Sequence, residues 1–229
     1  MVSWRVLVFV VVGVFYGLPS VSAQTLHHRL SVRIQPVQHT LEVVDRVSLG
    51  GAVSPDEAGA YRFVLHGGLS PRLLTEGWRL EPVDGPVEAG FFGINATTDT
   101  VAERVPLEAF LLVPEEEATQ PVEIAYGGRI DHALATQGEE YQRSFSETPG
   151  IIDERGVFLA GASFWVPTFG DGLMTFELEV NALTPPWKVV SQGRRTHHDG
   201  HAARRLFHHQ GPVGVAAHDL HRPRRDQSG

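Results

Sequence analysis

Histidine is concentrated in one stretch of this sequence, THHDGHAARRLFHH at residues 196–209, which holds five of the twelve histidines. Imidazole nitrogen is a common zinc ligand, and His197 and His201 are spaced i, i+4, so a helix would place both rings on one face. Gly200 disfavours that helix by about 1 kcal/mol relative to Ala, and Asp199 is better suited to a helix end. The two histidines are therefore weak metal candidates, and we expect at most opportunistic metal binding by this segment.

The residues around these histidines lack the rest of a catalytic zinc motif. Such a motif carries Glu after the first histidine, as general base on the metal-bound water, and His198 occupies that position here. The chain contains no cysteine, which excludes zinc fingers, thiol catalysis and disulfides. The sequence therefore predicts no catalytic residue, no dedicated metal site and no cofactor in this chain.

Other patterns that could support hydrolysis or binding are incomplete. The carboxylates at 115–117 and 139–140 lie in polar loops, whereas a glycosidase needs two carboxylates about 5 to 9 Å apart across a cleft. Ser163, in GASFW, is not a nucleophile elbow, because that motif requires Gly-x-Ser-x-Gly. The aromatic stretch at Phe164 and Trp165 has two interpretations: an exposed sugar-binding platform, or the packed corner of a sandwich.

The elements that would position these residues are short strands. Leu30, Val32 and Ile34 alternate with polar residues, and residues 41–49 repeat the pattern with Asp45 among the apolar positions, as half-buried strands require. Further strand patterns, bounded by Gly and Pro, occur at 61–65, 105–113, 121–130, 156–161, 173–180 and 187–193. The sequence predicts an all-β fold, an antiparallel β-sandwich of many short strands over residues 24–193.

The N-terminal end differs in composition from this body. Residues 1–23 combine Arg5, an apolar run at 6–15 and the small residues Ser22 and Ala23. This pattern predicts a secretory signal peptide cut after Ala23, and hence a secreted or periplasmic protein. A membrane span needs about 20 apolar residues, so we expect no stable membrane span after signal cleavage. The alternative is that residues 1–23 are kept as an uncleaved anchor.

The C-terminal end, residues 194–229, is a basic tail. It holds seven arginines and three aspartates, whereas the whole chain has a net charge of −8, so the body before it is acidic. Nucleic-acid binding requires basic residues on one face, and we expect no nucleic-acid partner. The tail has few large apolar residues and no sustained alternation. We expect it to be disordered, because it cannot offset its ordering entropy.

The order of several motifs resembles that of a known family. The segments HHRLSVRIQPVQHTLEVVDRVSL, YRFVLHGGLSPRLL, VEIAYGGRI, GVFLAGASFWVPTFGDGLMTFELEV and WKVVSQGRR follow one another. Together they resemble, over residues 28–195, the N-terminal β-sandwich domain of aminopeptidase-N-like zinc metallopeptidases, the gluzincins. The resemblance implies a non-catalytic domain whose partner is a following catalytic domain. In the full-length enzyme that domain holds the zinc and cleaves N-terminal residues from peptides.

The sequence departs from the family where catalysis would occur. It contains neither His-Glu-x-x-His nor Gly-x-Met-Glu-Asn, and FLAGASFW lacks the Gln or Glu with which the family holds the substrate amine. No catalytic or substrate-binding residue can therefore be transferred. Arginine is used almost to the exclusion of lysine, as in a GC-rich gene. We expect a chain truncated before the catalytic domain, with residues 194–229 read out of frame.

Two other functions compete with this one. The first is a stand-alone extracytoplasmic β-sandwich module that binds carbohydrate or peptide, with Phe164 and Trp165 as its platform and the histidine-rich tail as a metal scavenger. The second, which ranks last, is an active hydrolase that uses scattered carboxylates. Enzymatic activity is left open by the sequence, and we expect the chain to be inactive alone.

Overall fold

The computed structural model describes residues 25–87, 105–116, 118–132, 148–172, 174–181 and 187–192, together with the backbone of three strands at 194–198, 202–209 and 215–219. The predicted signal peptide, residues 1–23, lies outside the described residues. So do His201 and most of the tail. Within the described residues, no helix is long and apolar enough to cross a bilayer.

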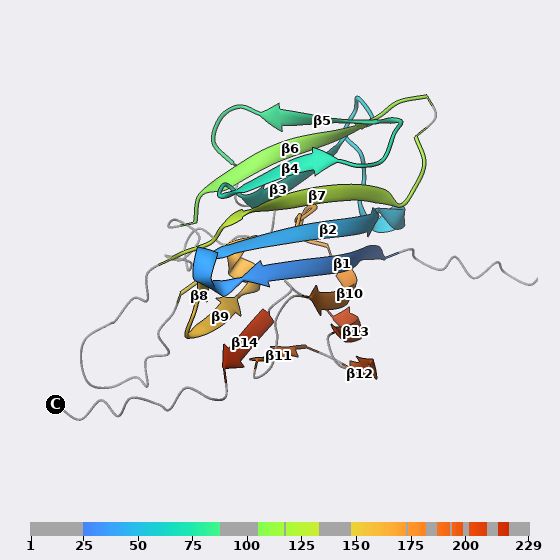
Figure 1. Cartoon of the computed structure of the whole chain (residues 1–229). Helices are drawn as coiled ribbons and strands as arrows, with labels where there is room; N and C mark the ends of the chain where they lie inside the picture. The colour runs from blue at the N-terminus through green and yellow to red at the C-terminus, as the bar shows by residue number, and fades with distance from the viewer. Residues whose placement is uncertain are drawn as a thin grey trace, which may run out of the picture.

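The described strands form three sheets (Figure 1). The seven-stranded sheet has the order β12-β13-β10-β1-β2-β7-β4, with bounds β1 Leu26–Gln35, β2 Thr40–Ser48, β4 Leu69–Leu73, β7 Val122–Arg129, β10 Met174–Asn181, β12 Arg194–His198 and β13 Ala202–His209. The four-stranded sheet, β11-β14-β9-β8, contains β8 Gly150–Asp153, β9 Gly156–Leu159, β11 Trp187–Ser191 and β14 Val215–Asp219. The three-stranded sheet, β3-β6-β5, contains β3 Tyr61–His66, β5 Trp78–Val83 and β6 Leu107–Pro114.

Short 3₁₀ turns connect some of these strands, at η1 Pro36–Gln38, η2 Gly50–Ala52 and η5 Gly161–Ser163. The all-β fold of many short strands is thus confirmed. The seven-stranded sheet is mixed where the sequence predicts antiparallel pairing, because β1 pairs parallel with β10. That pairing joins segments almost 150 residues apart, as in Leu30 opposite Leu178, and no local turn signal reports such a long crossover.

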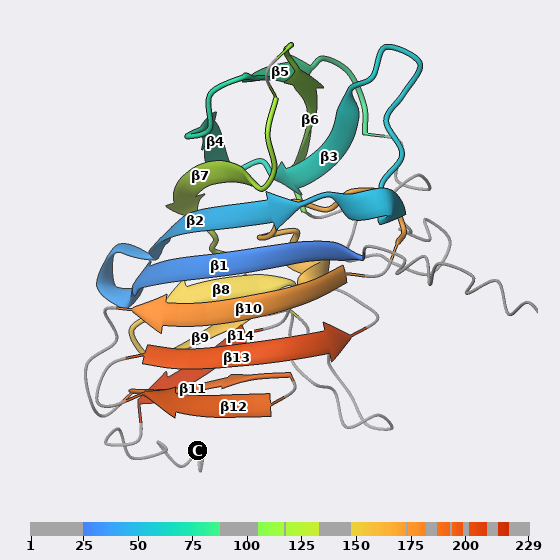
Figure 2. The same cartoon turned by 90° about the vertical axis from the view of Figure 1, so that its right-hand side faces the viewer.

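The alternation in β1 and β2 places one apolar row of each strand in the core. Leu30, Val32 and Ile34 of β1 are each 1% exposed, and Leu41 and Val43 of β2 are equally buried. The inner face of the seven-stranded sheet packs on the two smaller sheets. In Figure 2 the four-stranded sheet lies behind the seven-stranded sheet, and the three-stranded sheet lies above it. Two packed layers around one apolar core are the expected solution for sheets with one apolar face.

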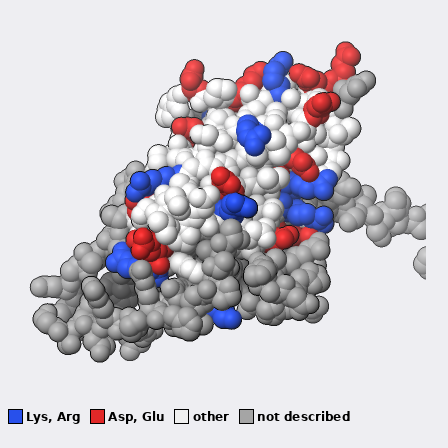
Figure 3. Space-filling model, in the orientation of Figure 1, with Lys and Arg blue, Asp and Glu red and all other residues white. Residues whose placement is uncertain are grey.

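The outer face of the seven-stranded sheet is polar and carries cross-strand ion pairs. Arg29 of β1 pairs with Glu177 of β10 at 3.0 Å between Nε and Oε2, and Arg46 of β2 pairs with Glu123 of β7 at 2.8 Å between Nε and Oε1. Arg29 and Arg46 are themselves opposite one another in the register. Basic and acidic side chains of the described residues are also interspersed over the face shown in Figure 3.

Three segments of the predicted disordered tail are strands of these sheets. β13 pairs with β10, with Phe207 opposite Phe176, and β12 pairs with β13. β14 pairs with β9 and β11. The sandwich therefore extends beyond residue 193. The physical reason is that β9 and β10 each offer a strand edge, and backbone groups at an edge pair with any extended segment whatever its apolar pattern.

Candidate functional site

The two weak metal candidates are not brought together on a helix. His197 lies in strand β12, opposite Ala203 of β13, and His201 lies outside the described residues. A strand rises about 3.3 Å per residue, so the helical i, i+4 geometry that suggested a shared ligand face does not apply at His197. Across the described part of the chain, no group of three or more His, Cys, Asp or Glu side chains could hold a metal ion.

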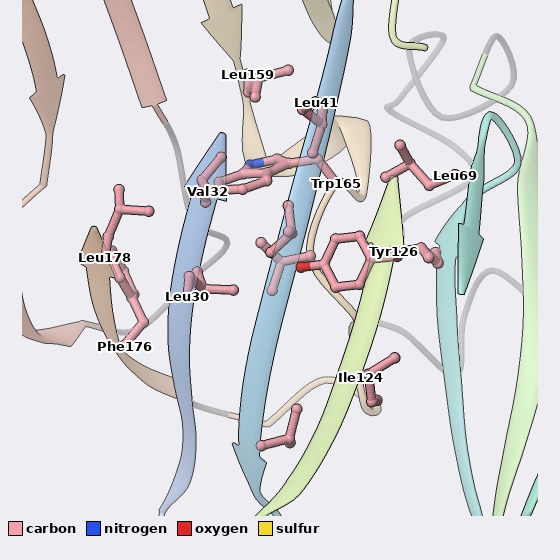
Figure 4. Close-up of a cluster of buried hydrophobic side chains, with 14 of the residues drawn as sticks. Leu30, Val32, Leu41, Leu69, Ile124, Tyr126, Leu159, Trp165, Phe176 and Leu178 are labelled. Atoms are coloured by element: carbon pink, nitrogen blue, oxygen red, sulfur yellow. The ribbon is translucent and has the colours of Figure 1, made fainter. Parts of the chain in front are cut away.

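The aromatic stretch is packed inside the sandwich. Trp165 is 1% exposed and lies among Val32, Leu41 and Leu159 (Figure 4), and Phe164 is 8% exposed. A ring that stacks on a sugar must present a face to solvent, so these side chains do not form a platform. The packed-corner interpretation is the one that the burial supports.

The other candidate residues from the sequence, a serine and several loop carboxylates, do not form a site among the described residues either. Ser163 is fully buried, and its hydroxyl donates to the carbonyl of Ala160 at 2.7 Å, so it serves the η5 turn rather than a reaction. Glu115 and Glu116 are exposed, as expected of a solvated loop. The other carboxylates considered in the sequence, at 117 and 139–140, lie outside the described residues.

A buried polar cluster, which sequence reasoning did not assign, lies in the core. His28 of β1 and Asp45 of β2 are both 0% exposed, and Nδ1 of His28 is 2.7 Å from Oδ2 of Asp45. The hydroxyl of Tyr126 points into the same core (Figure 4), and burial, followed by the negative charge of Asp45, raises its pKa. His28 Nε2, Asp45 Oδ1 and the Tyr126 hydroxyl have no hydrogen-bond partner among the described residues.

This cluster combines an acid and an imidazole, as hydrolase sites do, yet it cannot act on a substrate. A general base must lie within hydrogen-bond reach of the proton that it removes, and no solvent-accessible path reaches two side chains that are fully buried. Buried polar groups that are only partly hydrogen-bonded lower stability. The only signal in the sequence is Asp45 on the apolar face of its strand.

A pair of histidines lies at the end of β3. His66 is 3% exposed, and its Nε2 is 2.8 Å from Nε2 of His132. The backbone amide of Gly68 donates to Nδ1 of His66 at 2.8 Å. Nδ1 therefore carries no hydrogen, so the neutral His66 ring is protonated at Nε2 and donates to His132.

The same hydrogen bonds make this pair unsuited to a metal. A histidine that binds a metal through Nε2 carries a hydrogen on Nδ1 and donates it to an acceptor. Nδ1 of His66 faces the Gly68 amide, which is itself a donor. The pair is thus built to share a proton, and burial, followed by the proximity of His132, lowers the pKa of His66 to about 4.

The outer face of the four-stranded sheet carries exposed apolar side chains. In β9, Val157 and Leu159 are buried, whereas Phe158 between them is 44% exposed. In β11, Val189 is buried and the next residue, Val190, is 63% exposed. Because side chains alternate between the two faces of a strand, Phe158 and Val190 both point away from the core.

Strand pairing aligns these residues in one row. Val190 is opposite Ala216 of β14, Ala216 is opposite Phe158, and Phe158 is opposite Ile151 of β8. Directly opposed residues project from the same side of a sheet. We call the row formed by Ile151, Phe158 and Val190 the apolar stripe.

Polar groups flank the apolar stripe. Lys188 is exposed on the same face of β11, and Asp153 at the end of β8 pairs with Arg155 at 2.8 Å. The hydrogen bond from Arg155 holds the pKa of the Asp153 carboxyl below its usual value. An apolar centre with a charged rim is the composition of a surface that another protein layer covers.

Comparison with known proteins gives structural likeness without sequence likeness. No family model matches the sequence, and the search of curated proteins found no significant match. Among solved structures, the M1 zinc metallopeptidase from Deinococcus radiodurans aligns over 85% of this chain at 12% identity with a TM-score of 0.44. Native yeast LTA4 hydrolase aligns over 85% at 12% identity with a TM-score of 0.48. This chain spans 41% and 28% of the lengths of those two proteins.

Proposed function

We propose that this β-sandwich is the non-catalytic amino-terminal domain of an aminopeptidase-like zinc metallopeptidase that acts in a secreted or periplasmic location. The order of sequence motifs supports the family. The observation that carries the domain role is the apolar stripe, because a domain that functions alone leaves few contiguous apolar side chains uncovered. We place the catalytic domain against this stripe, with Phe158 and Val190 buried at the contact.

In this proposal the zinc ion belongs to the catalytic domain, and the sandwich contributes structure. The described residues do not fit a zinc site of their own, since they provide no cluster of three ligands and the Gly68 amide opposes metal ligation by His66. The domain's role is to cover one side of the catalytic domain. The full-length enzyme would then remove N-terminal residues from peptides.

The competing function, a carbohydrate- or peptide-binding module, has less support. Its platform would be Phe164 and Trp165, and both are buried in the core. Ligand-induced change in tryptophan fluorescence would favour this alternative over a domain role.

Two observations test the proposal: an activity assay on the purified chain, and the sequence of the neighbouring DNA. The purified chain is incubated with zinc and an aminoacyl p-nitroanilide, and we expect no turnover above buffer. We also expect the DNA immediately downstream of this coding sequence to encode a His-Glu-x-x-His segment in one of its reading frames. Chelator-sensitive turnover by this chain would overturn the non-catalytic role. Absence of that segment from every downstream frame would overturn the link to a zinc domain.

A further inference from the structure

The row that contains the apolar stripe crosses the four-stranded sheet and takes one residue from each strand. In order, these are Ile151 of β8, Phe158 of β9, Ala216 of β14 and Val190 of β11. Neighbouring strands lie about 4.8 Å apart, so the row is about 14 Å long. Phe158 is 44% exposed and Val190 is 63% exposed, whereas position 216 between them is alanine. The bulkiest and the smallest residue of the row are therefore neighbours at its centre.

A row with charged ends runs beside the apolar stripe on the same face. The register places Asp153 opposite Gly156, Gly156 opposite His218 and His218 opposite Lys188. At the β8 end, the turn of residues 153–155 carries two carboxylates and one guanidinium, a net charge of −1. At the β11 end, Lys188 is exposed and forms no ion pair within the described residues. The two ends of this row thus carry opposite charges.

A second copy of the chain complements both rows when a two-fold axis parallel to the strands relates it to the first. An axis that runs between β9 and β14 in the plane of the contact places β8 of each copy over β11 of the other, and β9 over β14. Phe158 then faces the small Ala216 of the other copy, and Ile151 faces Val190. The same rotation sets the turn of residues 153–155 against Lys188 of the other copy.

The alternative two-fold axis, parallel to the row, does not give this match. It sets each strand over its own counterpart, so Phe158 meets Phe158 and Ala216 meets Ala216. Bulky residues would then hold the sheets apart while a gap remains at the alanines, and gaps forfeit dispersion contacts. This axis also carries Lys188 away from the turn of residues 153–155. Shape and charge therefore favour the axis parallel to the strands.

We propose that the isolated chain forms a two-fold dimer through the apolar stripe, with Phe158 of each copy over Ala216 of the other. Because a two-fold contact is self-complementary, each pairing occurs twice. Burial of Phe158, Ile151 and Val190 drives association, and the charged row fixes the register. The dimer rests on the surface that the proposed function also uses. In the full-length enzyme, the catalytic domain would occupy this surface in place of the second copy.

Cysteine cross-linking tests the axis, because the native chain contains no cysteine. Ile151→Cys and Val190→Cys are prepared separately, one of them with a size tag, and are oxidised alone and as a mixture. We expect a disulfide-linked dimer from the mixture and little from either variant alone, since like positions lie about 14 Å apart along the row. Val44→Cys, at an exposed valine on the outer face of the seven-stranded sheet, should link to neither. Equal cross-linking of each variant alone, or no link in the mixture, would overturn the proposal.

Charge reversal at exposed positions gives a second measurement that leaves the core unchanged. Lys188→Glu should raise the dissociation constant of the dimer about tenfold in sedimentation equilibrium, because two repulsive contacts arise per dimer. Adding Glu154→Lys, which reverses the net charge of the turn, should restore the wild-type value to within about threefold. Arg33→Glu, the same reversal on the outer face of the seven-stranded sheet, should leave the dissociation constant unchanged. An equal loss from Arg33→Glu, or no rescue by Glu154→Lys, would contradict the pairing.

Failure of the dimer and failure of the proposed function give different results. A wild-type chain that associates, but whose cross-links follow another pattern, overturns the two-fold dimer and leaves the apolar stripe as a contact surface. A wild-type chain that stays monomeric overturns the dimer outright. The relationship to a zinc enzyme is decided by the downstream DNA, whatever the dimer does.

Discussion

The chain of hydrogen bonds through His66 leaves no position for a second proton. Nε2 already carries a hydrogen toward His132, and protonation of Nδ1 would set two donors, the ring and the Gly68 amide, against each other. Burial and the neighbouring His132 both disfavour the charged ring, which is why the pKa of His66 is lowered to about 4 from 6.5. The pair thus joins the end of β3 to the segment after β7 only while His66 is neutral.

This coupling predicts a pH-dependent stability. Between pH 6.5 and about 4 the unfolded chain binds a proton at His66 that the folded chain does not, so stability is lost as the pH falls through this window. From pH 7 to pH 4 the free energy of unfolding should fall by about 2 kcal/mol more in wild type than in His66→Asn, measured by urea denaturation.

His132→Asn is the informative comparison for this prediction. It should keep most of the pH-dependent loss, because burial, the larger cause of the lowered His66 pKa, remains. Equal pH slopes for wild type and His66→Asn would contradict the account of this pair.

Residue-scale features were only partly predictable from the sequence. Asp45 was visible as a carboxylate on an apolar strand face, but its partner His28 looked like one of several scattered histidines. The His66–His132 contact spans 66 residues. Such contacts depend on which strands become neighbours, and local spacing does not encode that information.

At the scale of elements, strands with clear alternation were predictable and short edge strands were not. The patterns at 30–34 and 41–49 correspond to β1 and β2. β4 was missed because Pro71 interrupts it; proline is tolerated there because β4 is the edge of its sheet. Strands β12, β13 and β14 were missed because backbone pairing to the edge of a sheet requires no strong alternation of apolar residues.

One glycine controls how closely β4 approaches β7. Gly128 is opposite Leu69, and a Cβ at position 128 would collide with the carbonyl oxygen of Gly68, which accepts the amide of Arg129 at 3.2 Å. We predict that Gly128→Ala lowers the free energy of unfolding by about 3 kcal/mol, measured by urea denaturation, because strand pairing must open to admit the methyl group.

Gly51→Ala is the matched control, since a Cβ there meets nothing within 4 Å. Its effect should stay within about 0.5 kcal/mol. A loss at Gly128→Ala as small as that at Gly51→Ala would show that the close approach of β4 does not contribute to stability.

At the scale of the whole molecule, the two outer faces differ in character. The seven-stranded sheet presents ion pairs to solvent, such as Arg46 with Glu123, as a free face does. The four-stranded sheet presents the apolar stripe. The proposed domain role explains this difference. The outer face of the seven-stranded sheet is polar and faces solvent, whereas the outer face of the four-stranded sheet contacts a further protein layer.

The central claim is therefore that the apolar stripe is a contact surface, and sedimentation velocity tests it most directly. The isolated wild-type chain should associate as its concentration rises, because Phe158 and Val190 are uncovered. The Phe158→Ser, Val190→Ser double variant should remain monomeric. Val37→Ser, which removes an equally exposed but isolated valine (64% against 63%), should behave as wild type. Monomeric wild type across the series, or a double variant that associates as wild type does, would contradict the claim.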